Sequence, residues 1–376
     1  MVLWARNRVQ ISPEDLAKKM SVSVDKVKAW EDENEPEYPT FNQAVNLSSK
    51  LRVPLGYLYL AEPPVEDIPI PDLRTIANKP LTNPSVDFID TLYDAYRKQD
   101  WFKTYLLQEA VSELEFAGKY TINDNLKTIA SDICETLQIN NDLRRHSPTW
   151  EQFFTALVRR TEDSRILVLR NSIVGNDVHR KLDVNEFRGF VLFDKIAPIV
   201  FINSKDYQTA QIFTLIHEIA HIWMGESGIS NLDFKLKDTQ QRVNLDGFCD
   251  SVASEVLVPE NEFNPQWDNN RTIDDNVNRL ALYFKVSSFV ILRRAYSLSL
   301  LSENEFFDCY DDLLTKIRPK PKEKGGNFYN MLKARNSYTL TMLLMTGLTN
   351  GTVTANEASQ LLNVRSASLK GIENSL

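Results

Sequence analysis

Two histidines four residues apart, His217 and His221, enclose a glutamate, Glu218, within an apolar segment of this 376-residue chain. Residues four apart lie on one face of an α-helix, so two imidazoles at this spacing can bind one Zn²⁺. The glutamate between them can face a metal-bound water and accept its proton. The HExxH pattern therefore predicts a zinc site for hydrolytic chemistry on a helix, against the alternative of two ordinary helical histidines.

A hydrolytic zinc site needs a third protein ligand, which leaves the fourth position for water. The following segment, residues 246–258, is expected to be a helix that ends before Pro259. It carries four candidate donors: Asp246, Cys249, Asp250 and Glu255. The first three share one face by their spacing, and the residue types alone do not choose among them. The other two histidines, His146 and His179, lie in polar surroundings and are expected at the surface.

Three apolar segments, residues 164–170, 187–193 and 199–202, are expected to form strands. The third precedes the HExxH helix directly. We expect it to lie beside the cleft and to pair with an extended substrate by strand addition. By residue type alone, Arg293 and Tyr296 are candidates for stabilising an oxyanion, although a structural role is the simpler interpretation of each.

The first 62 residues are expected to form a compact helical bundle. Ser12 and Ser23 are good N-caps, and Val22 falls in a tight turn between two short apolar stripes, which predicts a helix-turn-helix. Lys26 and Lys28 on the second helix are candidates for contacting DNA phosphates. However, residues 1–60 contain eight Lys/Arg and eight Asp/Glu, so operator DNA and a protein partner both remain open for this module.

The expected organisation is an N-terminal helix-turn-helix bundle (1–62), a proline-rich connector (63–85), a metal domain with a helical lead-in (86–262) and a helical C-terminal region (263–376). Two later segments, 280–291 and 358–369, repeat the spacing of the first helix-turn-helix. This repeat indicates either further helix-turn-helix-like modules or only the general likeness of two short helices joined by a tight turn. A basic stretch over residues 316–324 is expected to be a solvated loop, with contact to nucleic acid or an acidic partner as the alternative. These patterns predict a mostly helical α+β protein with one small sheet.

The composition argues against several classes of protein, including membrane-spanning and secreted proteins. A net charge of −8 argues against a surface that coats nucleic acid, although a local basic site remains compatible with it. The sequence lacks a run of 18 apolar residues and the pattern of a signal peptide, and its three cysteines are widely spaced. We therefore expect a cytoplasmic protein without a membrane partner.

The chain resembles the ImmA/IrrE-type zinc metallopeptidases fused to an N-terminal XRE-type helix-turn-helix. The similar segments are residues 213–221 (FTLIHEIAH), 187–190 (FRGF), 248–250 (FCD), 255–259 (EVLVP), 71–75 (PDLRT) and 325–329 (GGNFY). The resemblance implies a zincin-like domain that binds Zn²⁺ through His217, His221 and Asp246, with Glu218 as the catalytic base. Asp246 stands where that family has a glutamate, so its side chain is one methylene shorter.

The resemblance also implies a function: a regulatory zinc endopeptidase that cleaves a partner protein, such as a transcriptional repressor, in stress response or mobile-element control. The alternative is a non-proteolytic regulator or antitoxin that neutralises a partner toxin and represses its own operon through operator DNA.

Overall fold

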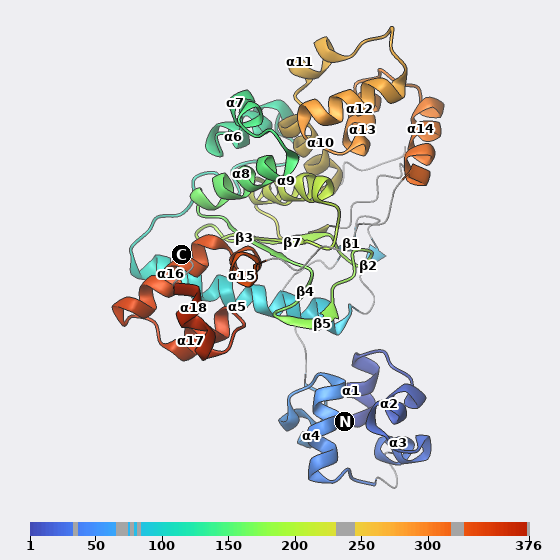
Figure 1. Cartoon of the computed structure of the whole chain (residues 1–376), viewed down its shortest axis with the longest axis vertical. Coiled ribbons are helices and arrows are strands. Elements are labelled where there is room, and N and C mark those ends of the chain that lie inside the picture. Colours follow the sequence, from blue (N-terminus) through green and yellow to red (C-terminus); the bar gives the residue numbers. More distant parts are fainter. Residues whose placement is uncertain are drawn as a thin grey trace. The chain divides into compact units, whose positions relative to one another are not determined.

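The computed structural model describes residues 1–32, 37–64, 74–75, 79–80, 84–230, 245–316 and 327–373 (Figure 1). These residues belong to two compact units: residues 1–69 with 82–92, and residues 70–81 with 93–376. Most of the predicted proline-rich connector and most of the basic stretch at 316–324 lie outside the described residues. Among the described helices, none combines the length and apolar character needed to cross a bilayer.

The N-terminal unit is a bundle of short helices. Its elements are α1 (Val2–Arg8), α2 (Pro13–Met20), α3 (Val24–Glu31), α4 (Phe41–Leu51) and the 3₁₀ helix η1 (Leu55–Tyr59). Both predicted caps are confirmed, since Ser12 Oγ accepts a hydrogen bond from the backbone of Asp15 and Ser23 Oγ accepts one from Lys26. Leu16, Val27 and Trp30 contribute to the core between α2 and α3.

The tight turn after α2 recurs twice in the larger unit. Its first residue, Ser21, has a left-handed backbone with φ 56°, and Lys285 and Asn363 have φ 60° and 55°. The next residue is a valine each time, and its amide donates to a carbonyl five residues earlier. The two predicted repeats therefore adopt the same local turn, after α12 (Ile273–Phe284) and after α17 (Ala355–Leu361).

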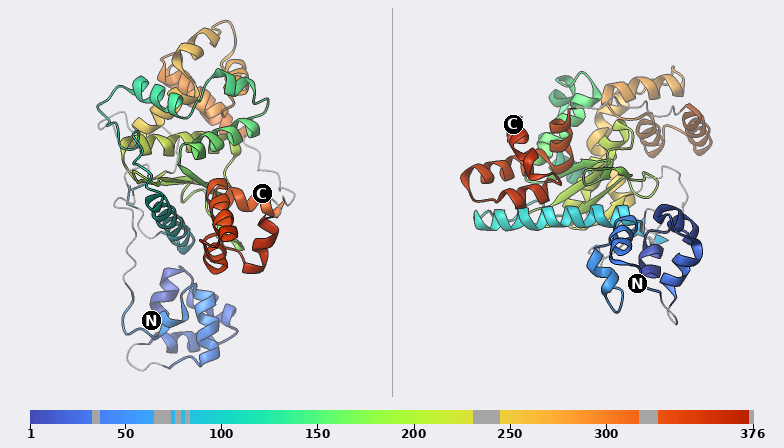
Figure 2. Two further views of the ribbon diagram at one scale, coloured as in Figure 1. Left: turned by 90° about the vertical axis from the view of Figure 1, so that its left-hand side faces the viewer. Right: turned by 60° about the horizontal axis from the view of Figure 1, so that its bottom comes forward.

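The larger unit is built on a four-stranded mixed sheet in the order β3-β7-β6-β8. The strands are β3 (Leu167–Asn171), β6 (Gly189–Leu192), β7 (Ile199–Asn203) and β8 (Gly228–Ser230). β3 and β7 are parallel, whereas β6 is antiparallel to both β7 and β8. α8 (Trp150–Asp163) and α9 (Gln208–Met224) cover one face of the sheet, and α5 (Val86–Gln108) lies on the other (Figures 1 and 2).

The other helices pack around this layer. They are α6 (Leu126–Thr136), α7 (Asn141–Arg145), α10 (Leu245–Leu257), α11 (Glu260–Phe263), η2 (Asn264–Gln266), α13 (Ser288–Ser297), α14 (Glu303–Lys316), α15 (Phe328–Asn336), α16 (Tyr338–Asn350), η3 (Ser366–Ser368) and α18 (Leu369–Glu373). α10 packs against both α9 and α6, and residues from all three join one continuous apolar core. The expected class, a mostly helical α+β protein, is confirmed.

The role expected for strand 199–202 is wrong. This segment is β7, and both of its edges are already paired, with β3 on one side and β6 on the other. No edge is left for an added substrate strand. Among the described strands of this sheet, the free edge near the HExxH helix belongs to β8, which was not predicted. Two short hairpins were also not predicted: β1 (Arg74–Thr75) with β2 (Lys79–Pro80), and β4 (Ile173–Val174) with β5 (Asp177–Lys181).

Candidate metal centre

The HExxH segment lies in the middle of the most deeply buried helix. Every residue of α9 from Gln211 to Met224 is buried, because the helix is held between the sheet, α8 and α10. It ends at Gly225, whose left-handed φ of 77° favours glycine. His217 and His221 therefore occupy successive turns of a rigid helix, with their side chains toward α10.

Three predicted ligands come together between α9 and α10. His217, His221 and Asp246 each offer an atom that lies within 4.8 Å of the other two. The two Nε2 atoms are 3.1 Å apart, and His221 Nε2 is 3.3 Å from Asp246 Oδ1. Two ligand atoms on a tetrahedral zinc ion are separated by about 3.3–3.4 Å, given Zn–N bonds of about 2.0–2.1 Å. The donor set and its spacing therefore fit zinc.

The burial of this cluster supports the same fit. His217 and His221 are almost completely inaccessible to solvent. Two imidazole lone pairs that face each other at 3.1 Å repel unless a proton or a cation lies between them. Asp246 reaches the cluster although its side chain is one methylene shorter than the glutamate of the similar family. Its side chain remains 20% exposed, which leaves the cluster open on that side.

A second carboxylate on α10 holds the first histidine in place. His217 Nδ1 lies 2.9 Å from Asp250 Oδ1, and Arg293 Nη2 of α13 lies 3.2 Å from Asp250 Oδ2. With the proton on Nδ1, His217 donates to the carboxylate and turns its Nε2 lone pair toward His221 and Asp246. Arg293 thus points toward Asp250. This position does not support the oxyanion-stabilising role for which it was one candidate.

These contacts shift the pKa values of both partners. Burial alone would lower the pKa of His217, but the hydrogen bond and the negative charge of Asp250 outweigh it and raise the pKa to about 9. Burial pushes the pKa of Asp250 upward, but the bond to His217 and the charge of Arg293 bring it below its usual range. The pKa of His221 is lowered, first by burial, with the neighbouring His217 acting in the same direction.

Glu218 is completely buried and approaches strand β6. A Cβ atom on Gly189 would lie 2.8 Å from Glu218 Oε1 and 2.6 Å from Thr214 Cγ2. Only a glycine leaves room for the glutamate at this point. Gly189 was part of the FRGF segment of the resemblance, but its contact with the catalytic candidate depends on the pairing of β6 and could not be read from the sequence.

His221 lies next to the free edge of the sheet. A Cβ atom on Gly228 of β8 would be 3.4 Å from His221 Cε1. Among the described residues, His221 Nδ1 is buried and makes no hydrogen bond. The backbone of β8 therefore passes directly beside the imidazole ring, and this links the sheet edge to the metal cluster.

The remaining candidate residues have structural positions. Cys249 is buried, which raises the pKa of its thiol well above the usual value. Glu255 forms an ion pair with Arg294, and the ring of Tyr296 packs against Phe306 with centroids 4.9 Å apart. His146 and His179 are exposed, as predicted.

The two lysines proposed for nucleic-acid binding lie on α3 in the N-terminal unit. Lys26 forms an ion pair with Glu37, whereas Lys28 is exposed. Asp25, in the first turn of the same helix, is exposed as well. Of the acidic residues that follow this helix in the sequence, Glu33 and Glu35 lie outside the described residues.

Comparison with known proteins bears on the larger unit. Neither the curated proteins nor the solved structures contain a match to this chain. A family model matches residues 161–296, which include the sheet, the histidines of α9, the acidic residues of α10 and Arg293 of α13. The model is that of the IrrE N-terminal-like domain of the M78 peptidases, so this segment is similar to a domain of a family whose members are zinc-dependent peptidases.

Proposed function

We propose that this protein is a regulatory zinc-dependent endopeptidase that cleaves a partner protein, with a transcriptional repressor as its substrate. The observation that carries the proposal is the meeting of His217, His221 and Asp246 beside the buried Glu218, inside the segment that matches a peptidase family. Regulation is part of the proposal because the N-terminal unit, with its α2–α3 pair, adds a module that peptide hydrolysis does not need.

The roles of the residues follow from their positions. His217, His221 and Asp246 would hold the zinc ion, and Asp250 keeps His217 in the tautomer that leaves Nε2 free. Bound zinc lowers the pKa of water to about 7 and polarises a carbonyl group. Glu218 accepts the proton of the attacking water and passes it to the leaving amine. Burial of Glu218 shields this proton transfer from bulk solvent.

The substrate would lie along β8. This strand is the edge of the sheet among the described residues, and its Gly228 lies against the ring of His221. An extended peptide that pairs with β8 would pass its backbone over the metal cluster. The short strand β1 of the same unit lies close to β8, so a peptide bound along β8 would also lie close to β1.

The deciding experiment compares the full chain with its Glu218→Gln variant. Candidate substrates are the proteins encoded by the genes next to this one, incubated with zinc-loaded protein and followed by mass spectrometry. We expect about one zinc per chain in both proteins and a cleavage rate at least about 100-fold lower in the variant, since a general base contributes about 10²–10⁴-fold. Equal cleavage by both proteins, or a chain that takes up no zinc, would refute the proposal.

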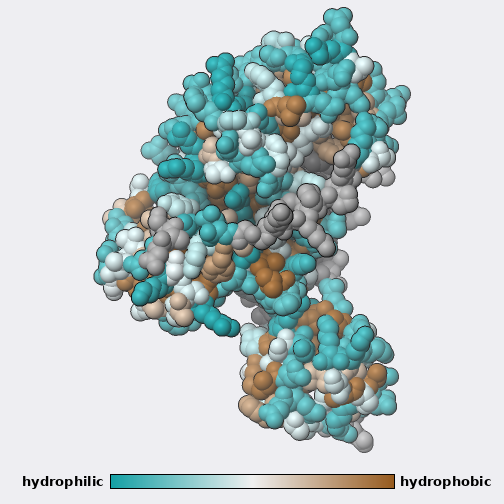
Figure 3. All heavy atoms as spheres, in the orientation of Figure 1, coloured by the Kyte–Doolittle hydropathy of each residue, from teal (hydrophilic) through white to brown (hydrophobic). Residues whose placement is uncertain are grey.

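The N-terminal unit favours the second candidate, a non-proteolytic regulator or antitoxin that acts through a bound partner or operator DNA. Several large apolar side chains are exposed on this unit: Tyr38, Phe41, Val45, Tyr59 and Leu60. Figure 3 shows hydrophobic residues, in brown, on the surface of the N-terminal unit. Exposed aromatic groups of this kind are typical of protein contacts. If Glu218→Gln leaves the cellular function unchanged while deletion of the N-terminal unit abolishes it, this second function replaces the first.

A further inference from the structure

A cavity whose lining includes none of the metal ligands lies where the C-terminal helices meet α5 and the β4–β5 hairpin. Its volume is about 720 Å³, within the range of small-molecule sites. The lining comes from three elements that are distant in sequence. α5 contributes Arg97, β5 contributes Arg180, and the turn after α17 contributes Asn363 and Arg365.

The cavity is positively charged in a chain whose net charge is −8. Three arginines line it against one acidic residue, Asp177. Arg365 is exposed, and its side chain makes no hydrogen bond or ion pair with any other described residue. A further arginine, Arg335, approaches from α15 and donates a hydrogen bond to Asn176 in the lining. Arginine side chains converging on one hollow favour an anion that accepts several hydrogen bonds.

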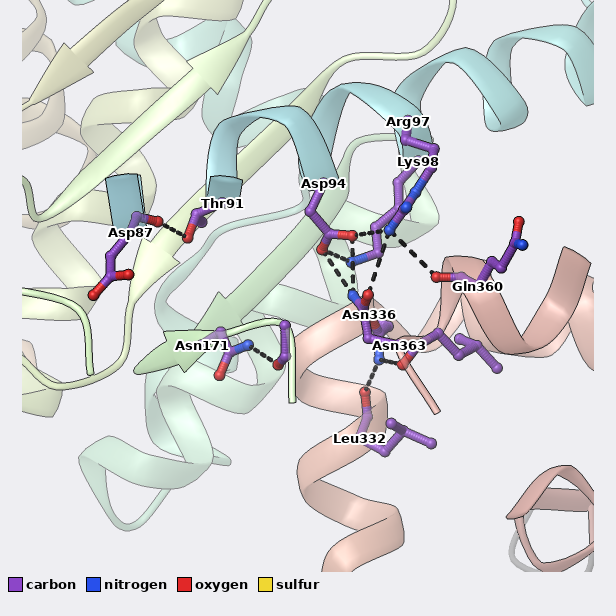
Figure 4. Close-up of polar contacts among 12 residues, drawn as sticks. Asp87, Thr91, Asp94, Arg97, Lys98, Asn171, Leu332, Asn336, Gln360 and Asn363 are labelled. Carbon is purple, nitrogen blue, oxygen red and sulfur yellow. Dashed lines mark hydrogen bonds and ion pairs between the residues drawn. The ribbon is translucent and has the colours of Figure 1, made fainter. Parts of the chain in front are cut away.

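Arg97 of the lining is itself bonded within the protein, because its Nη2 donates to Asp94, to the carbonyl oxygen of Gln360 and to Asn363 Oδ1. Asp94 of α5 accepts hydrogen bonds from Lys98, Arg97 and Asn363 (Figure 4). Lys98 is buried, and its ion pair neutralises the carboxylate within the protein. Arg97 therefore reaches the cavity with a side chain that remains 51% exposed and carries positive charge beyond what Asp94 needs.

The walls are held in place by the local backbone. Asn363 occupies the left-handed position of the turn, and its Nδ2 lies 3.0 Å from both oxygens of Asp94. Gly175 at the tip of the β4–β5 hairpin packs against Asn363, and its carbonyl accepts a hydrogen bond from Asn171 (Figure 4). Phe328, which is 38% exposed, adds an aromatic surface to the lining.

We propose that this cavity binds a free nucleoside phosphate, with its phosphates on Arg97, Arg180 and Arg365 and its base against Phe328. The arginines supply charge and paired donors for phosphate oxygens. The aromatic ring supplies the flat apolar surface on which a base stacks. The ligand would join α5, the hairpin and the C-terminal helices, and its binding does not depend on the peptidase activity.

The test measures binding of ATP, GTP, UTP, inorganic pyrophosphate and a short single-stranded oligonucleotide to the full chain at low ionic strength, by calorimetry and by the shift in melting temperature. We expect at least one nucleoside triphosphate to bind and pyrophosphate to compete with it. Arg365→Gln should weaken both ligands by about tenfold, the usual effect of losing a charged hydrogen bond. Arg145→Gln is the matched control, because Arg145 is exposed on α7 and does not line the cavity.

Phe328→Ala distinguishes binding of the base from binding of the phosphates. It should weaken nucleoside triphosphates by about tenfold, the effect of losing one stacking contact, and should leave pyrophosphate unchanged. The proposal is overturned if no nucleotide binds at millimolar concentration, if Arg145→Gln weakens binding as much as Arg365→Gln, or if only a single-stranded oligonucleotide binds. Because Arg365 and Phe328 are both partly or fully exposed, neither substitution removes core packing, and unchanged melting temperatures of the unliganded variants would verify this.

Discussion

His217 of α9 donates a hydrogen bond from Nδ1 to Asp250 of α10, whose Oδ1 atom is 2.9 Å away. This bond determines which ring nitrogen of His217 faces the metal cluster. Arg293 binds the other oxygen of the same carboxylate at 3.2 Å. The series of arginine, aspartate and histidine runs from α13 to α9 through α10. Because these three side chains contact one another, the packing of the three helices fixes the orientation of the His217 imidazole.

Replacing Asp250 with alanine should weaken zinc binding without removing a ligand. His217 would lose its hydrogen-bond acceptor, and the affinity for zinc should fall about 10–100-fold, the usual effect of losing such a partner. Competition with a chromophoric zinc chelator measures this change. Ser251→Ala on the exposed side of the same helix is the control and should bind zinc like the original protein. An unchanged affinity in the Asp250 variant would show that the bond does not position the ligand.

The raised pKa of His217 predicts opposite pH trends for stability and for zinc binding. In the metal-free protein the favourable charge on His217 is fully present below its unfolded pKa of 6.5 and is lost as the pH rises through about 9. The free energy of unfolding should therefore fall by about 1–3 kcal/mol between pH 6.5 and 9. Zinc affinity should rise over the same interval, because the metal must replace a proton.

Urea unfolding of chelator-treated protein at several pH values tests this prediction. Asp250→Asn is the comparison, since it removes the charge that raises the pKa of His217. The decrease in stability between pH 6.5 and 9 should then become smaller. If the original protein and this variant lose equal stability between pH 6.5 and 9, titratable groups other than His217 cause the pH dependence.

Gly189→Ala should damage both stability and activity. The added methyl group would lie 2.6 Å from Thr214 Cγ2, 2.8 Å from Glu218 Oε1 and 3.0 Å from the carbonyl oxygen of Phe201. Overpacking of this kind costs about 1–3 kcal/mol and would displace Glu218. Chemical denaturation and the cleavage assay measure the two effects separately.

Gly247→Ala provides the control for this substitution. Nothing lies within 4 Å of a Cβ at Gly247, which is in helix α10 close to Asp246. Alanine there should be neutral or stabilising by up to about 1 kcal/mol, because it favours the helix. The double variant Gly189→Ala, Thr214→Ser removes the closest contact, so it should regain part of the stability while activity stays low. Full recovery of activity would show that Glu218 tolerates the methyl group.

Lys28→Gln tests whether the N-terminal unit binds operator DNA. Lys28 is exposed on α3, so loss of a phosphate contact should weaken binding to promoter DNA and reduce the slope of log affinity against log salt by about 1. Fluorescence anisotropy over a range of salt concentrations measures both quantities. Lys50→Gln on α4 removes an equal charge from another exposed position. The same loss in both variants would point to general electrostatics, and no binding at all would favour a protein partner.

Local sequence was sufficient to predict the features that depend on neighbouring residues. The spacing of His217 and His221 places them on one face of any helix, and the caps at Ser12 and Ser23 act on amides three residues away. The tight turn after α2 was also predicted, and its spacing recurs in the sequence where the structure has the turns after α12 and α17. Each of these depends on a repeat of about 3.6 residues or on a single turn, and both are visible in the order of the residues.

The tertiary structure decided which elements meet. Strand 199–202 was identified correctly as a strand, but its place between β3 and β6 depends on pairing with segments that are distant in sequence. The same holds for the bond from His217 to Asp250 and for the space that Gly189 leaves for Glu218. Strand pairing and helix packing are long-range choices governed by the burial of whole faces, and the pattern within one segment carries no information about its neighbours.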